Sequence, residues 1–240
     1  MKTLGFILIV AIFWLPGSAT ADLLAPTGLN PGEQYRIVFV SSTQIDGVSG
    51  ALSVYNAHVT NAANSGTETS KLAAATWTAI ASVAAVSARS NTGTTGSAAI
   101  PIYLVDGTTK VADGYDDFWD ATLAAPINLD ESGNAIAVNS FVWTGTATDG
   151  SQFFGNELGG AAAPRIGNWA ASDSDWISAG TGGHSVLRSV YGLSSVLTVT
   201  AAVPEPHSSA VVAAALIAIC FGGRLLGNSH LRWSRQANGN

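Results

Sequence analysis

The sequence predicts an α+β domain, and three observations lead to that fold class. Residues 35–42, YRIVFVSS, are rich in β-branched and aromatic side chains, as a buried strand would be. Residues 48–63 carry apolar side chains three and four positions apart, which is the spacing of one helix face. Residues 195–202, SVLTVTAA, alternate as a last strand would. Helix early, strands late and long loops between them are typical of an α+β arrangement.

The N-terminus has the order of regions that a secretory signal peptide requires. Lys2 supplies the positive charge, and residues 4–15 are nearly all apolar. Ala19 and Ala21 fit the small-x-small rule, so we expect signal peptidase to cut before Asp22 after export through the Sec translocon. Residues 1–21 are therefore predicted as a cleaved signal helix. A permanent N-terminal anchor is the alternative interpretation.

Composition limits what the exported part can bind and how it is held together. Residues 22–34 are predicted as a linker and residues 35–202 as one domain, which is long enough for a substantial core. Residues 22–203 carry fifteen acidic and six basic side chains, a formal charge of −9, which argues against a nucleic-acid partner. The one cysteine, Cys220, lies beyond the domain, so no disulfide can form within it.

The middle of the chain is punctuated by turns. Residues 72–86 are apolar, and periodicity leaves open whether they form helix, strand or both. Residues 100–105 are predicted as a strand that ends in the turn pair Asp106-Gly107, and 127–130 run into a turn at 131–134. Residues 141–146 are predicted as a strand that enters a glycine-bearing loop, with 93–96 as loop before them.

The C-terminus combines a short apolar run with a basic end. Residues 210–223 are apolar or small, and Arg224 can snorkel, so we expect a transmembrane helix over about 208–226. Arg232 and Arg235 follow without any acid, and basic residues stay on the cytoplasmic side. The expected topology places the domain outside the cell membrane. A core helix is the alternative, but this run lacks a polar face.

Val203-Pro204-Glu205-Pro206 precedes that helix, and the two prolines force extended backbone there. This motif, the helix and the arginine-rich end resemble the PEP-CTERM sorting signal of Gram-negative bacteria, over residues 203–240. The resemblance implies processing near Pro-Glu-Pro by an exosortase, a membrane cysteine protease, and a link to exopolysaccharide production. The tail after Arg224 is longer than is typical of the signal, which bears on the efficiency of processing.

A second resemblance covers roughly residues 35–176. The segments LVDGTTKVA, PINLDESGN, VWTGT and GNW follow the order of a bacterial extracellular domain of the C-type-lectin-like fold. Relatives often bridge the first helix to a late strand by a disulfide, and here Val59 and Ile166 are expected to replace it by apolar packing. The Glu-Pro-Asn type loop that holds calcium in sugar-binding members is absent, so calcium-dependent sugar binding is not carried over.

Two groups of residues are candidates for binding. Asp113, Asp116, Asp117 and Asp120 offer oxygens that calcium favours, although the EF-hand order is missing and a solvated loop with Phe118 and Trp119 turned inward is the preferred interpretation. No other cofactor is expected. Asn168, Trp169 and Trp176 form the candidate ligand loop, whereas most tryptophans are predicted to lie in the core.

We therefore expect a non-enzymatic protein of a Gram-negative bacterium that passes through the inner membrane to the cell surface or extracellular matrix. A structural or adhesive role linked to exopolysaccharide, as in a biofilm, comes first, and a glycan-binding, lectin-like module is the alternative. An extracellular hydrolase ranks third, because His184-Ser185 lies outside any Gly-x-Ser-x-Gly elbow.

Overall fold

The fold is described from a computed structural model, which places residues 25–136 and 141–201. These residues belong to one compact unit within Met1–Ala201. The predicted signal peptide, including Ala19, Ala21 and Asp22, and the predicted sorting signal, with Val203–Pro206 and Arg224, lie outside the described residues. Among the helices of the described part, none has the length and apolar character that a membrane crossing requires.

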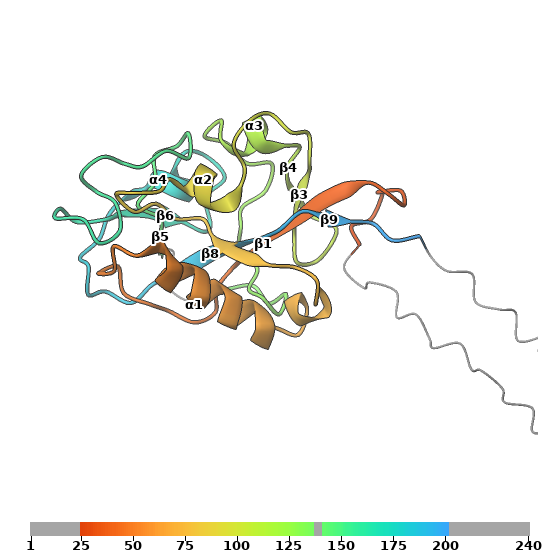
Figure 1. Cartoon of the computed structure of the whole chain (residues 1–240), viewed down its shortest axis with the longest axis horizontal. Helices are drawn as coiled ribbons and strands as arrows, with labels where there is room; N and C mark the ends of the chain where they lie inside the picture. Colours follow the sequence, from red (N-terminus) through yellow and green to blue (C-terminus); the bar gives the residue numbers. More distant parts are fainter. Residues whose placement is uncertain (1–24, 137–140, 202–240) are drawn as a thin grey trace, which may run out of the picture. The chain divides into compact units, whose positions relative to one another are not determined.

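The unit is α+β, as predicted, and a mixed sheet organises it (Figure 1). The strands are β1 (Gln34–Val40), β2 (Trp77–Ala79), β3 (Ile102–Leu104), β4 (Lys110–Ala112), β5 (Phe141–Trp143), β6 (Arg165–Asn168), β7 (Gly180–Thr181), β8 (Ser189–Ser194) and β9 (Leu197–Thr198). Their order is β4-β3-β1-β8-β5-β6-β7, with β2 also paired to β8 and β9 to β1. The β1–β3 and β5–β8 pairs are parallel, and the other pairs are antiparallel.

The helices are short apart from the first one. They are α1 (Leu52–Ser65), the 3₁₀ turn η1 (Thr69–Lys71), α2 (Ala88–Thr92), α3 (Tyr115–Phe118) and α4 (Asp175–Ser178). Figure 1 shows α1 on one side of the sheet and the three other α-helices on the opposite side. The predicted helix over 48–63 is confirmed, and the ambiguous stretch 72–86 contains β2 but no helix.

Two core clusters lie on the two faces of the sheet, because successive side chains of a strand point to opposite faces. Tyr35, Ile37 and Phe39 of β1 enter the cluster beneath α1, which also holds Val59 and Ile166. Val59 and Ile166, which were expected to pack in place of a disulfide, are both buried in this cluster. The other cluster includes Val38, Phe118, Trp119, Trp176 and Tyr191.

The order of helices and strands differs from the expected one. Strands occur from residue 34 to residue 198, and the predicted last strand over 195–202 is reduced to β9. The central strand β8 lies just before it and pairs with β1, β2 and β5. A wholly buried strand shows no alternation of polar and apolar residues, so the alternating pattern pointed to the less buried β9.

Candidate functional site

The four acids predicted as weak calcium ligands surround α3, and each side chain is exposed; they are Asp113, Asp116, Asp117 and Asp120. Asp117 accepts the backbone N–H of its neighbour at position 113 at 2.7 Å. Asp116 lies 3.6 Å from Arg89, and Asp120 accepts two hydrogen bonds from Thr122. No group of three or more His, Cys, Asp or Glu side chains within residues 25–136 and 141–201 could share a metal ion. The predicted inward orientation of Phe118 and Trp119 is confirmed, since they are 0% and 5% exposed.

The predicted ligand loop is divided between surface and core. Trp176 lies in α4 with no exposed surface, and its ring packs 5.0 Å from Phe118 and 6.0 Å from Tyr191. It therefore belongs to the core and presents no face to a ligand. Trp169 is half-buried and packs against the same cluster. Asn168, at the end of β6, is half-buried, and its Oδ1 accepts the backbone N–H of Ala170 at 3.0 Å.

Three strands bring Asn168, Phe141 and Arg188 into one row. Asn168 of β6 lies directly opposite Phe141 of β5, so both side chains stand on the same sheet face. The parallel pairing of β5 with β8 then places Arg188, just before β8, beside Phe141. Phe141 is 38% exposed, so part of its ring is open to solvent. We call these three residues the Arg188 platform.

The guanidinium of Arg188 rests against two aromatic rings. Its Cζ lies 5.4 Å from the Phe141 ring centroid and 5.3 Å from the Trp143 ring. The backbone is fixed by two hydrogen bonds with Ile45, each 2.9 Å long. Burial lowers the pKa of Arg188 from its ordinary value, and the side chain still remains charged at neutral pH. The side chain is thus held in place by ring contacts rather than by an acid.

Neighbouring loops hold further apolar side chains at the surface near the platform. Val186 and Leu187 directly precede Arg188 and are 42% and 55% exposed. Their loop is tied to residues 45–50 by the hydrogen bond from Gly47 N to His184 O at 2.7 Å. The ring Nε2 of His184 lies 2.9 Å from Gly160 O, so this histidine joins two loops and does not contact the adjacent serine hydroxyl through that nitrogen.

A histidine, two serines and a glutamate meet at the end of β1. His58 Nε2 lies 3.2 Å from Thr43 O and 3.3 Å from Ser41 Oγ. Ser41 Oγ donates to Thr43 O at 2.8 Å, so its proton is already engaged. Glu131 accepts from the backbone N–H and the hydroxyl of Ser42, rather than from the histidine. This connectivity differs from a Ser-His-acid triad, in which the acid orients the imidazole.

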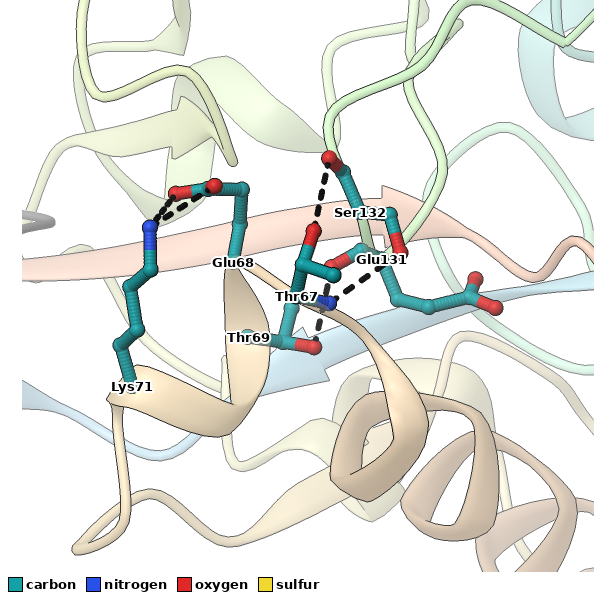
Figure 2. Close-up of polar contacts among 6 residues, drawn as sticks. All are labelled: Thr67, Glu68, Thr69, Lys71, Glu131 and Ser132. Atoms are coloured by element: carbon teal, nitrogen blue, oxygen red, sulfur yellow. Dashed lines mark hydrogen bonds and ion pairs between the residues drawn. The ribbon is translucent and has the colours of Figure 1, made fainter.

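The same glutamate ties the end of α1 to the turn at 131–134, and Figure 2 shows these contacts. Thr69 N donates to Glu131 O at 3.1 Å, and the Thr69 hydroxyl lies 2.6 Å from Ala63 O in α1 and 3.1 Å from Glu131 O. Thr67 N donates to Ser132 Oγ at 3.2 Å, while Lys71 pairs with Glu68 at 2.7 Å on the surface (Figure 2). The expected turn is therefore a structural anchor for the first helix.

Sequence reasoning identified Asn168 and missed Arg188 and the exposure of Phe141. Phe141 was predicted within a strand, but its partner residues depend on which strands lie beside it. Arg188 carries no motif, and its isolation from acids is a property of the folded domain. A count of the six basic residues in an acidic domain was the one signal that could have directed attention to it.

Comparison with protein-family models found no match, and comparison with curated proteins found none.

Proposed function

We propose that the protein is an exported, non-enzymatic component of the cell surface or extracellular matrix of a Gram-negative bacterium, with a structural or adhesive role linked to exopolysaccharide. The observation that carries the role is the group of large apolar side chains left exposed on a domain whose turns are otherwise closed by hydrogen bonds. They are Val48, Val54, Phe141, Phe154, Val186, Leu187 and Val196, and Phe154 is 96% exposed. Val186 and Leu187 directly precede Arg188 of the platform, and adjoining exposed apolar side chains favour contact with another molecule.

Delivery by an exosortase is part of this proposal. It is supported by the order of a signal peptide, Val203-Pro204-Glu205-Pro206, an apolar run and a basic end. We propose further that the domain is C-type-lectin-like, which agrees with an α+β unit that has a mixed sheet, one long helix and long connecting loops. The inner membrane then holds the chain only until the enzyme processes it.

Removal of residues 203–240 tests delivery. The truncated chain should be exported and should fail to reach the surface fraction in normal amounts. Mass spectrometry of the native C-terminus should find an end near Pro206. Normal delivery of the truncated chain would refute the sorting role.

Glycan binding is the second candidate, because the Arg188 platform sets an exposed aromatic ring between an amide and a guanidinium. Titration with the host polysaccharide, followed by tryptophan fluorescence with and without a calcium chelator, distinguishes the candidates. A saturable change favours the glycan-binding module, and its loss with chelator would indicate a calcium site. A flat response favours the structural role, and turnover of ester, glycoside or peptide substrates would favour the third-ranked hydrolase.

A further inference from the structure

We propose that the Arg188 platform binds a carboxylated sugar residue of an acidic polysaccharide. This inference rests on the proposed association with exopolysaccharide and names the chemistry of the sugar that the domain would recognise. The guanidinium would take the carboxylate, the Phe141 ring would take the C–H face of the sugar, and the Asn168 amide would take a hydroxyl.

Arg188 is the exception among the basic side chains of the domain. The six within the described residues are Arg36, Lys71, Arg89, Lys110, Arg165 and Arg188. Five of them have a hydrogen-bonding or charged partner, and the partners are, in the same order, Ser194, Glu68, Asp116, Asp113 and Ser178. No hydrogen bond or ion pair joins the Arg188 side chain to any described residue, and its buried Nε has no acceptor. The described residues include fourteen acidic side chains, and the isolation of Arg188 from all of them leaves a charge free for an external anion.

The guanidinium of Arg188 is already ordered. Ring contacts to Phe141 and Trp143 hold its plane, and the backbone bridge to Ile45 holds its base. An arginine fixed in this way loses little side-chain freedom when it binds, and its terminal N–H groups match the two oxygens of a carboxylate. Gly182 packs closely against the same pair, since a Cβ there would lie 3.2 Å from Arg188 Nε and Nη2 and 3.1 Å from the Trp143 ring.

The surroundings of Arg188 favour a sugar over an acidic peptide. The anion site lies in a row with an exposed ring and an amide, which come from three adjacent strands of the sheet. A pyranose with a carboxylate offers an apolar C–H face and hydroxyls at the same time, and aromatic rings with a few polar groups suit such ligands. An acidic peptide would need several positive charges, and the platform supplies a single one, Arg188.

The test uses the full chain, purified in mild detergent, and calorimetric titration with hexagalacturonate. The matched ligand control is the methyl-esterified hexamer, which keeps the sugar and removes the charge. We expect saturable binding of the acid form, and its affinity should fall with added salt. The ester should bind at least about tenfold more weakly than the acid, because a charge-assisted pair is lost.

Variants assign the site. Arg188→Met should weaken binding about tenfold or more, and Phe141→Leu and Asn168→Ala should weaken it severalfold. Lys71→Met removes the same charge from the exposed pair with Glu68 and should bind as the parent does. If Arg188→Met fails to fold, as judged by the unfolding midpoint, Arg188→Lys serves instead and should still weaken binding, because it keeps the charge and loses the planar fork.

Equal binding of the acid and the ester, unchanged binding by Arg188→Met and Arg188→Lys, or equal binding of hexaglutamate would each overturn the inference. The proposed function is judged separately, by retention of the protein in the host matrix. If Arg188→Met is retained as the parent is, the adhesive role stands, and binding of a carboxylated sugar is not its cause.

Discussion

Substitution of Gly66 by alanine tests whether the contact between Thr69 and Glu131, drawn in Figure 2, fixes the end of α1. Gly66 is buried at the C-terminal cap, and a Cβ there would lie 2.3 Å from Glu131 O and 2.5 Å from Thr69 Oγ1. Its backbone is extended, with φ of −72°, so alanine can adopt the conformation without backbone strain. The expected effect is therefore steric and is confined to this contact.

The magnitude follows from what the added methyl group displaces. The hydrogen bond from Thr69 N to Glu131 O and the bond of the Thr69 hydroxyl, which is nearest to Ala63 O, would be lost or lengthened, at about 1 kcal/mol each. Crowding a packed contact adds about 1–3 kcal/mol, and the surface turn η1 can relieve part of it. We expect Gly66→Ala to lower the free energy of unfolding by about 2–4 kcal/mol, which corresponds to about 5–15 °C in the unfolding midpoint.

Urea unfolding followed by tryptophan fluorescence measures this difference. Gly180→Ala is the matched control, because a Cβ at that position meets nothing within 4 Å and the backbone needs no positive φ. The control should stay within about 0.5 kcal/mol of the parent. If Gly66→Ala were as stable as the control, the turn at Glu131 would not anchor α1 and the reasoning would be refuted.

Three further predictions concern buried polar groups. Ser194→Ala should destabilise the domain by about 1–3 kcal/mol in urea, because the fully buried Ser194 Oγ accepts from Ile37 N at 2.9 Å; an effect below the error would show that this N–H finds another acceptor. Burial lowers the pKa of His58, so the folded state binds its proton less readily than the unfolded state, and the stability present above pH 6.5 should be lost as the pH falls below it. His58→Gln should flatten that slope in unfolding midpoints measured between pH 7.5 and 5, and an unchanged slope would assign it to other groups. Asn91→Ala should lower the free energy of unfolding by about 1–3 kcal/mol, because its amide exchanges hydrogen bonds of 2.8 and 3.0 Å with Asn56 between α2 and α1. Thermal unfolding measures this loss. Asn134→Ala is the control, and its loss should be smaller because Asn134 is an exposed turn residue.

Much of the local structure could be predicted from the sequence. The strand at β1 followed from its β-branched and aromatic side chains, and the helix at α1 followed from apolar side chains three and four positions apart. The turn at Asp106 was also predictable, because its carboxylate accepts the backbone N–H groups of Thr108 and Thr109 within the turn. These features depend on residues a few positions apart, so a linear sequence is enough to reveal them.

The candidate site could be predicted only in part. Asn168 was recognised as a polar residue in a loop-rich region, but Trp176 was placed with it and lies in the core. Whether an aromatic ring beside acids and glycines is buried depends on what packs against it, here Phe118 and Tyr191. Those partners come from distant parts of the chain.

By itself the sequence determined the α+β class, the first strand and helix, the turn acids and the absence of a disulfide in the domain. Only the tertiary structure decided that β8 is the central strand. Its residues, SVYGLS, look like loop, and Gly192 is there because a Cβ would lie 2.6 Å from the Phe39 ring on β1. The same strand order sets Arg188 between aromatic rings and away from acids. Strand pairing joins residues more than a hundred positions apart, and no local pattern encodes that proximity.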